Sequence, residues 1–551
     1  FIEKEELKEF KDGEKVVINF KSWENINDAP HGKIIKSLGT PGETETEIHA
    51  ILHDYGLPYE FPKSIVNEAN KIPVEIEKKE IEKRKDFRDT LTFTIDPRSA
   101  KDFDDALSFK DLGEGKIEVG IHIADVSYYV KPNSELDSEA YSRATSVYLV
   151  DRVVPMLPEK LSNRLCSLRP KEEKLTFSAV FILDELGKVE SVWYGKTIIY
   201  SDYRFAYEEV QTMLETNTPI VGASQALSGK KYTVPLRVFD AIKKLDKRAK
   251  FLRKERMNSG AISFDRVEVN FNLDDKNRPE SVFFKTSKDA HKLIEEYMLL
   301  ANRKVAEFIG LNNKKIPFVY RVHDDPDEQK LENLKKTVGS FGYSFNISKK
   351  NINKEINNLL LSCQGKKEQN LIDTLTLRCM SKAAYTTQNI GHYGLAFSHY
   401  THFTSPIRRY PDILVHRLLH NFLEGSTAAS ESIIEEACEH SSQREQLATK
   451  AERESIKYMQ MVFMEDKIGK EYEGVISGVT ERGLYVEILE NKCEGMIRTV
   501  DIKGDYFCFD MEKHSLVGKR TKKIYQLGDT LKIKVKKVNL IKRFLDFVLI
   551  D

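Results

Sequence analysis

The sequence predicts an α+β central domain flanked by two small all-β segments. Three observations predict this fold class. Strand-like runs dominate from Asp86 to Tyr200, helical periodicity takes over from Asp202, and both ends of the chain show short alternating runs separated by Gly and Pro. With 551 residues the chain is too long for a single hydrophobic core, so about three domains are expected.

The first segment, residues 1–65, resembles part of a small barrel. EKVVINF from Glu14 and KIIKSLGTPG from Lys33 are strand-like, and the polar loop KSWENINDAPHG joins them. Between Ile51 and Lys85 the alternation is lost and charged residues accumulate, which predicts a helical connection, with the linker proper at residues 66–85. Because the chain begins at Phe1, without Met or a signal peptide, we expect it to be a fragment of a longer protein.

The central domain is expected at residues 86–466. One helix in it should be buried, because apolar residues recur at steps of three and four around much of its circumference. These residues are Leu293, Ile294, Tyr297, Leu300, Ala301, Val305 and Phe308. A long charged helical region, Ser430 to Met464, closes the domain.

The last segment, residues 467–551, predicts a second small barrel. EYEGVISGVTERGLYVEILENKCEGMIR alternates strictly, turns at Glu481 to Gly483, and is followed by strands up to Ile550. Barrels of this kind bind single-stranded nucleic acid through aromatic side chains and a basic groove. The candidate aromatics, each equally consistent with a place in the core, are Tyr472, Tyr485, Tyr506 and Phe507.

Composition excludes several classes of protein. No apolar run approaches 18 residues, so no membrane span is expected. The six cysteines lie far apart without a C-x-x-C pair, which predicts reduced thiols of a cytoplasmic protein and neither zinc nor a disulfide framework. No G-x-x-x-x-G-K-[ST] sequence is present, which excludes a P-loop.

The net charge is zero and gives no support to nucleic-acid binding, but the charges are unevenly distributed. Ten Lys and Arg residues lie between Lys519 and Arg543. A basic surface that leads to an acidic centre suits a protein that binds RNA and a cation together. A solvated edge strand explains Lys532 to Lys537 equally well.

The most informative segment, Thr94 to Ser108, places four aspartates directly after a strand: Asp96, Asp102, Asp104 and Asp105. Carboxylates this close raise the pKa of one another unless a cation neutralises them. Oxygen ligands without interleaved His or Cys favour Mg²⁺ or Mn²⁺ over zinc, and the spacing does not fit a calcium loop. The alternative is a solvated acidic turn, but the position at a strand end favours a metal site for phosphate chemistry.

The pattern D-P-x-x-A-x-D-x-D-D-A resembles the first signature of the RNB family of exoribonucleases, to which RNase II and RNase R belong. Four further blocks follow in the family's order: HIADVSYYV from His122, VPMLPEKLSNRLCSL from Val154, LIEEYMLLANR from Leu293 and HFTSPIRRYPDILVHRLL from His402. The flanks are more similar to the RNase R branch. The resemblance implies a partial cold-shock OB-fold at 1–65, the RNB catalytic domain at 86–466 and an OB-fold of the ribosomal S-one type at 467–551.

The same resemblance implies roles for individual residues in catalysis. Asp96, Asp102, Asp104 and Asp105 are expected to hold the metal, and Asp104 is expected to be the most sensitive residue for cleavage. Arg408 is expected on the phosphate near the scissile bond, where its planar fork offsets developing charge. Glu452 matches an acid that assists product release, although by itself it reads as a solvated helix residue.

Binding roles are implied as well. Tyr148 is expected to stack on the 3′-terminal base, and Tyr207, assisted by Glu295 or Glu296, to recognise the ribose 2′-hydroxyl. A second clamping aromatic is expected among Phe264, Phe271 and Phe284. Arg409 is expected to face elsewhere. The histidines His122, His402 and His416 are interpreted as structural because they lack metal-ligand spacing.

These features together predict a processive 3′→5′ exoribonuclease. It would hydrolyse RNA to nucleoside 5′-monophosphates and a short limit product with two Mg²⁺ ions, for which Mn²⁺ could substitute. The expected partners are single-stranded RNA and RNA with 3′ overhangs, and the expected state is a cytoplasmic monomer without membrane contact. The alternative is a non-catalytic RNA-binding pseudo-nuclease, against which the four aspartates and Arg408 argue.

Overall fold

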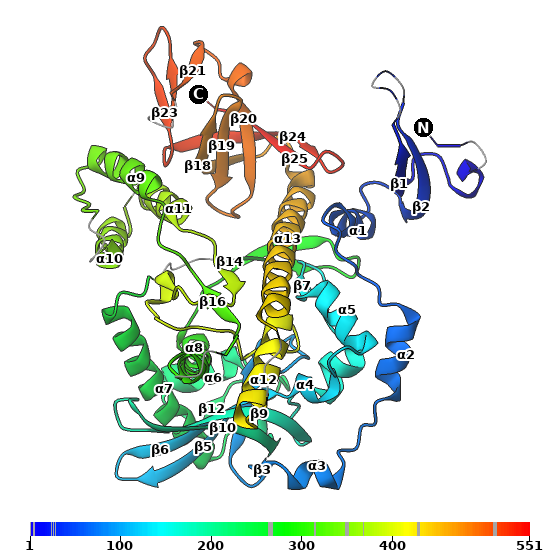
Figure 1. Ribbon diagram of the computed structural model, residues 1–551. Coiled ribbons are helices and arrows are strands. Elements are labelled where there is room, and N and C mark those ends of the chain that lie inside the picture. Colours follow the sequence, from blue (N-terminus) through cyan, green and yellow to red (C-terminus); the bar gives the residue numbers. More distant parts are fainter. Residues whose placement is uncertain are drawn as a thin grey trace.

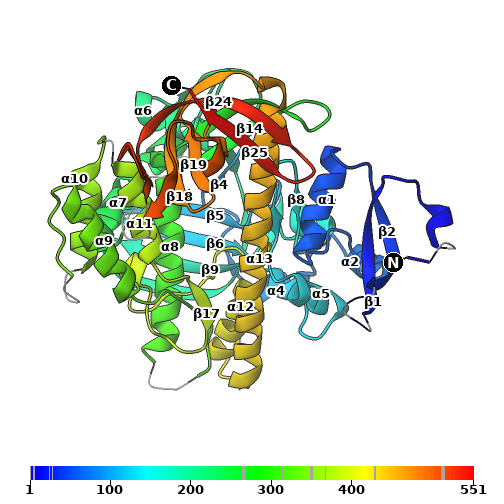
Figure 2. The same cartoon turned by 90° about the horizontal axis from the view of Figure 1, so that it is seen from above.

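The protein is described by a computed structural model. It describes residues 2–550 except residues 4, 5, 24, 26, 28, 263–267, 313–315, 348–351, 367, 427–429 and 511–514. Figure 1 shows a large central body with a small barrel above it and the N-terminal hairpin to one side. The long helix α13 (Glu431–Met464) rises from the central body toward the barrel. Seen from above in Figure 2, α13 separates the N-terminal hairpin from helices α9 to α11.

A seven-stranded sheet forms the centre of the large body, in the order β11-β4-β5-β6-β9-β10-β3. Neighbours from β4 to β10 are antiparallel, while β11 on β4 and β3 on β10 are parallel. The strands are β3 (Lys85–Asp86), β4 (Thr92–Asp96), β5 (Asp105–Gly113), β6 (Lys116–Ala124), β9 (Glu173–Leu183), β10 (Val189–Tyr200) and β11 (Tyr203–Ala206). Both faces are covered, which explains why β4 and β9 are almost continuously buried.

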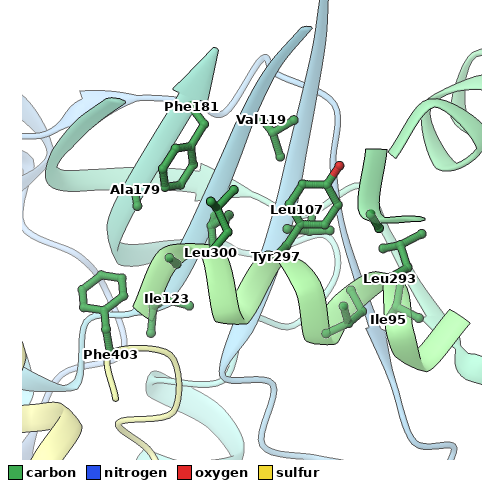
Figure 3. Packing of buried hydrophobic residues seen from close by; sticks show 14 of the residues in the cluster. Ile95, Leu107, Val119, Ile123, Ala179, Phe181, Leu293, Tyr297, Leu300 and Phe403 are labelled. Carbon is green, nitrogen blue, oxygen red and sulfur yellow. The ribbon is translucent and has the colours of Figure 1, made fainter. Parts of the chain in front are cut away.

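Helix α8 (Asp289–Gly310) crosses one face of this sheet, beside α7 (Leu236–Asn258) and α6 (Tyr207–Thr216). Figure 3 shows Leu293, Tyr297 and Leu300 of α8 packed toward Leu107 and Ile123 of the sheet. The fully buried Tyr297 donates its hydroxyl to the Leu245 carbonyl at 3.1 Å, so its burial leaves no polar group unpaired. The prediction of a buried helix is confirmed.

Shorter elements cover the other face and surround its end. A second hydrophobic cluster there includes Phe87, Phe103, Leu157, Ile407 and Tyr410. The elements are α4 (Val126–Tyr129), α5 (Glu135–Arg143), β7 (Val147–Tyr148), β8 (Val153–Val154), a π-helical turn (Leu161–Leu165) and α12 (Tyr410–Leu423). Helix α13 matches the helical region that the sequence predicts between Ser430 and Met464.

The segment after Asp202 is less purely helical than predicted. It contains three small antiparallel pairs, β12 (Ile220–Val221) with β13 (Tyr232–Thr233), β14 (Glu268–Leu273) with β15 (Pro279–Lys285), and β16 (Tyr320–Val322) with β17 (Ala384–Thr386). Helices α9 (Glu328–Ser340), α10 (Ile352–Cys363) and α11 (Gln369–Cys379) and a 3₁₀ turn (Tyr393–Leu395) complete it. These strands are short and partly exposed, so they lack a long alternating signal.

The front of the chain begins with a 3₁₀ turn (Glu6–Glu9) and forms a two-stranded antiparallel sheet, β1 (Lys15–Ser22) and β2 (His31–Gly39). Three helices follow, α1 (Thr44–Asp54), α2 (Lys63–Lys71) and α3 (Lys78–Glu82), and the first of them begins before the helical connection that the sequence predicts from Ile51. Pro62 precedes α2 and Pro73 follows it, and proline inside a helix removes a hydrogen bond and clashes with the preceding turn. The connection is therefore broken rather than continuous.

The end of the chain forms a closed five-stranded barrel, β18-β19-β20-β25-β24, and a three-stranded sheet, β21-β22-β23. The strands are β18 (Glu471–Thr480), β19 (Gly483–Ile488), β20 (Glu494–Arg498), β21 (Phe507–Asp510), β22 (Ser515–Gly518), β23 (Ile524–Gln526), β24 (Thr530–Asn539) and β25 (Phe544–Leu549), with 3₁₀ turns at Glu465–Lys467 and Thr499–Asp501. The predicted barrel is thus confirmed, including its turn after Thr480.

The three parts of the chain share contacts. The barrel core, with Leu484 and Phe547, belongs to the same hydrophobic cluster as Tyr458 and Met461 of α13. Glu47 of α1 is completely buried and contacts Lys15 of β1 at 2.6 Å and Arg543, between β24 and β25, at 3.6 Å. No helix among the described residues is long and apolar enough to cross a membrane.

Candidate active site

The four aspartates lie at one end of the central sheet, where β4 and β5 meet. Asp96 is the last residue of β4, Asp105 is the first of β5, and Asp102 and Asp104 belong to the loop between them. Pro97 ends β4 because proline has no N–H to continue the ladder. The side chains of Asp96 and Asp104 are buried, whereas those of Asp102 and Asp105 are partly exposed.

Burial raises the pKa of all four carboxyl groups above the ordinary aspartate value. The charges of Asp102 and Asp104 also raise the pKa of Asp96, and the charge of Asp96 raises the pKa of Asp105, because negative charges at one sheet end repel. Asp102 and Asp105 raise the pKa of Asp104 in the same way. The cluster therefore favours its protonated forms unless positive charge is brought to it.

Part of that positive charge comes from Arg408, three hundred residues further along the chain. Its Nε lies 3.7 Å from Oδ2 of Asp104, and the backbone N–H of Ile407 donates to Oδ1 of the same aspartate at 2.9 Å. The guanidinium opposes the effect of burial on the pKa of Asp102, Asp104 and Asp105. The structure thus places Arg408 beside Asp104, and its contact with a phosphate stays a prediction.

Arg409 faces the other way. Its guanidinium donates to both carboxylate oxygens of Asp412, at 2.8 and 2.9 Å, inside the protein. Its backbone forms a bridge to Thr145, and Ser146 donates its N–H to the Arg408 carbonyl at 3.0 Å. Arg409 therefore supports the segment that carries Arg408.

The same bridge positions Tyr148, two residues after Ser146 on β7. Its ring is 37% exposed, although it lies close enough to Asp102 and Asp104 for their charges to raise its pKa further above the value set by burial. Arg408 acts in the opposite direction. An exposed aromatic face can accept a stacked base, and stacking on Tyr148 stays a prediction.

Tyr207 lies on the other side of the cluster, at the start of α6. It follows Ala206, which pairs with Asp96 in the parallel β11–β4 ladder. Burial and the charges of Asp105 and Asp96 raise the pKa of its hydroxyl. Its ring stacks on His291 of α8, with centroids 4.1 Å apart and planes 15° from parallel. Sequence reasoning missed His291, which shares a helix face with Glu295 four residues later.

Glu295 and Glu296 do not meet Tyr207 through any hydrogen bond among the described residues. Both bind Arg256 of α7, Glu296 at 2.5 Å with its side chain buried and Glu295 at 3.3 Å with its side chain about half exposed. Burial raises the pKa of Glu296 and Arg256 opposes the shift. The pair therefore anchors α7 to α8, and a direct contact with ribose stays a prediction.

Glu452 is exposed on α13. Partial burial of its carboxyl group and the charge of Glu268 at the start of β14 raise its pKa, and among the described residues no hydrogen bond or ion pair joins it to the aspartates. Of the candidate clamping aromatics, Phe284 is 41% exposed and Phe271 is buried. Phe264 lies outside the described residues.

The three candidate histidines have internal partners. His122 is buried, and its ring nitrogens hydrogen-bond to Ser108 and Ser178. His416 is buried and pairs through Nε2 with the Phe403 carbonyl, and His402 pairs with the Tyr385 hydroxyl. These contacts give all three a structural role.

The barrel contributes a separate hollow. A cavity of about 1750 Å³ lies between the barrel and helices α10 and α11, lined by residues that include Tyr485, Met496 and Arg498. Tyr485 is partly exposed there, and Tyr506 is exposed outside it. Phe507 is buried, so the sequence alternative of a core residue holds for it.

The aspartates fit a divalent cation in their chemistry. Oδ2 of Asp96 is buried and has no hydrogen-bond partner among the described residues, and like charge raises the pKa of Asp96 and Asp105 together. Carboxylate oxygens are the donors that Mg²⁺ and Mn²⁺ prefer. No three acidic, His or Cys side chains of the described part converge as a preformed ligand set.

Comparisons with known proteins identify the family of each part of the chain. The RNB domain matches residues 84–425, the cold shock domain residues 1–62, and the S1 RNA binding domain residues 465–547. The chain belongs to the RNB family. It is 38% identical over 555 residues to a protein named Ribonuclease R from Aquifex aeolicus, covering 100% of this chain and 77% of that protein. The predicted fold class, an RNB domain flanked by cold-shock and S-one-type segments, is confirmed.

Solved structures of the family share the fold. Mycoplasma genitalium RNase R in complex with ribose-methylated single-stranded RNA matches with a TM-score of 0.92 and 28% identity, over 100% of this chain and 85% of that one. Yeast Ssd1, described as a pseudonuclease, matches with a TM-score of 0.69 and 21% identity, over 91% of this chain and 61% of that one. The second match shows only a shared fold. Whether the site can catalyse therefore depends on the side chains at the end of β4 and β5.

Proposed function

We propose that this RNB-family chain is a 3′→5′ exoribonuclease that hydrolyses RNA processively to nucleoside 5′-monophosphates. The observation that carries the proposal is the approach of Arg408, at 3.7 Å, to the buried Asp104 within a cluster of four carboxyl groups. A pseudo-nuclease would retain the fold without needing this arrangement. The proposed domains are a partial cold-shock segment at 1–65, a linker at 66–85, the catalytic domain at 86–466 and the terminal barrel at 467–551.

The proposed cofactor is Mg²⁺, with Mn²⁺ as a substitute, held by Asp96, Asp102, Asp104 and Asp105. When bound at such a site, a pair of divalent ions supplies an acidified water and compensates charge on the leaving oxygen. The aspartates would hold these ions, and Asp104 in addition accepts a hydrogen bond from the Ile407 backbone N–H, next to Arg408. This double contact makes Asp104 the residue whose loss should affect cleavage most.

Arg408 is proposed to bind the phosphate next to the scissile bond. The side chain is 38% exposed, so substrate can reach it, and Nη2 donates to Ser405 Oγ at 3.0 Å, which orients the guanidinium. A guanidinium offers parallel N–H groups to a phosphate and offsets the charge that develops as the bond breaks.

The nucleotide at the 3′ end is proposed to lie between the two tyrosines that flank the cluster. Tyr148 offers an exposed ring face for stacking, and Tyr207, held by its stack on His291, offers a hydroxyl toward the ribose. Glu295 and Glu296 are proposed to act on the ribose through the α8 surface, and Glu452 in product release.

Single-stranded RNA and RNA with 3′ overhangs are the proposed substrates, and the chain is proposed to act as a cytoplasmic monomer. The free thiols of all six cysteines fit a reducing compartment. The RNA path is proposed to pass the barrel at Tyr485, because OB-folds bind single strands on the second and third strands.

The test uses single-stranded RNA labelled at its 5′ end in one reaction and at its 3′ end in another. With Mg²⁺, the 3′ label should be released at once as a mononucleotide while the 5′ label shortens stepwise, and EDTA should stop both. RNA that is bound but stays intact with Mg²⁺ would instead support the non-catalytic alternative. Cleavage that persists in EDTA would overturn the metal role of the aspartates.

A further inference from the structure

The loop that carries the aspartates is held by a single arginine that takes no part in the proposed chemistry. Nη2 of Arg204 faces the carbonyl oxygens of Arg98 at 2.8 Å, Ala100 at 3.2 Å and Pro97 at 3.4 Å. Three backbone acceptors from one turn thus converge on one end of a guanidinium. A guanidinium can satisfy several carbonyls because its donors project in a fixed planar fork.

The position of Arg204 in the sheet explains this convergence. It lies on β11, parallel to β4, with Arg204 opposite Thr94 and Ala206 opposite Asp96. The guanidinium carbon also lies 4.8 Å from the ring centre of Phe103, the buried residue between Asp102 and Asp104. Arg204 therefore contacts both the beginning and the end of the aspartate loop.

A second residue restrains the loop from the side of the π-helical turn. Ser167 Oγ donates to the Lys101 carbonyl at 2.7 Å and accepts the Phe103 N–H at 3.0 Å. The backbone on both sides of Asp102 is thereby tied to buried groups. Arg204 and Ser167 therefore both restrain the backbone between Asp96 and Asp105.

Charge adds to this geometric role. Burial raises the pKa of Asp96, and the charge of Arg204 opposes this effect. Arg408 has the corresponding effect on Asp102, Asp104 and Asp105. Nε of Arg204, Oγ1 of Thr94 and Oδ2 of Asp96 are all buried without a hydrogen-bond partner in the described part of the chain.

We propose that Arg204 is a positioning residue that holds the aspartate loop in the geometry required for divalent-cation binding before RNA arrives. The inference rests on the proposed function, because it assumes that the aspartates hold Mg²⁺. Groups that orient metal ligands from behind typically change metal affinity by about 10- to 100-fold when they are removed. Arg204 should therefore matter for the metal and not for RNA.

The experiment compares Arg204→Lys with Arg248→Lys. Arg248 is a matched control, because its guanidinium also donates to three backbone carbonyls, those of Asp184, Lys244 and Gly115, but at the β9–β10 end of the domain. Lysine keeps the charge and loses the fork in both variants. Mn²⁺ binding to the RNA-free protein is measured by electron paramagnetic resonance, RNA affinity by anisotropy in EDTA, and folding by thermal denaturation.

We expect Arg204→Lys to weaken Mn²⁺ binding by about 10-fold or more, with RNA affinity in EDTA unchanged and a melting temperature like that of Arg248→Lys. Equal Mn²⁺ affinity in wild type and Arg204→Lys would overturn the inference, as would an equal reduction in both variants. Wild type that binds no Mn²⁺ would overturn the proposed metal site itself. If Arg204→Lys does not fold, Ser167→Ala removes the other restraint, and its unchanged Mn²⁺ affinity would count against the inference.

Discussion

Replacing Asp104 by Asn should separate catalysis from folding and from RNA binding. Asn keeps an oxygen that can accept the Ile407 N–H, so the bond at 2.9 Å, worth about 1 kcal/mol, is retained. The substitution removes the ion pair that Asp104 forms with Arg408 at 3.7 Å. Because the Arg408 side chain is 38% exposed, solvent screens this pair, and such a pair contributes about 0 to 1 kcal/mol. Because burial raises the pKa of Asp104, removal of its charge also relieves a desolvation cost.

The stability of Asp104→Asn should therefore lie within about 1 kcal/mol of wild type. Turnover should fall by about 10³-fold or more, equivalent to about 4 kcal/mol of transition-state stabilisation, because the carboxylate acts at the developing charge. A defect confined to the transition state lowers kcat and leaves RNA affinity near normal. Single-turnover cleavage of labelled RNA gives the rate, and anisotropy in EDTA gives the affinity.

Asp111→Asn is the control, since Asp111 is an exposed aspartate of the neighbouring β5, far along the strand from the cluster. It should cleave as wild type does. If Asp104→Asn cleaved RNA within a few-fold of wild type, the assignment of the site would be wrong. If it melted far below wild type, the hydrogen-bond reasoning would be wrong instead.

Three further predictions concern stacking, electrostatics and domain contacts. Tyr148→Ala should lengthen the final product, because removal of a stacking face weakens the grip on short RNA by about 1 to 3 kcal/mol, and an unchanged ladder on a sequencing gel would contradict it. Asp105→Asn should raise the melting temperature of the metal-free protein. The folded-state pKa values of Asp96 and Asp105 are raised, so the wild-type protein loses stability as pH rises. The difference in melting temperature between Asp105→Asn and wild type should therefore increase from about pH 5 to about pH 8. An equal difference at both pH values would refute this prediction. Glu47→Gln should leave Lys15 and Arg543 without a buried anion, at a cost of about 3 kcal/mol, and unchanged hydrogen-exchange protection of β1 would contradict that.

Features that depend on local periodicity can be predicted from the sequence. The buried helix around Tyr297, the long helix α13 and the alternating strands of the terminal barrel all repeat a pattern over many residues. The aspartate cluster can also be recognised in the sequence, because four negative charges within ten residues indicate that a cation compensates them. The residue types within a short segment and the spacing of its apolar residues are both local properties, so the sequence shows them directly.

Contacts between distant segments cannot be predicted in this way. The approach of Arg408 to Asp104 is expected only from the family resemblance, since nothing near either residue indicates the other. The sequence likewise does not indicate that Arg256 engages Glu296. Tertiary packing decides which charged residues form ion pairs. The sequence of α8 around Glu296 is equally consistent with a solvent-exposed helix face and with a buried ion pair.

The two arginines at the cluster show why residue type alone does not reveal a role. Arg204 directs its Nη2 donors to backbone carbonyls and packs over Phe103, so it cannot turn to a substrate without releasing the loop. Among the described residues the Arg408 side chain has one hydrogen bond, to Ser405, and it stays 38% exposed beside Asp104. An arginine that donates to backbone acceptors preserves geometry, while one that faces carboxylates and solvent can exchange them for a phosphate. The number and kind of partners, which appear only after folding, therefore distinguish the residue that prepares the site from the residue that acts in it.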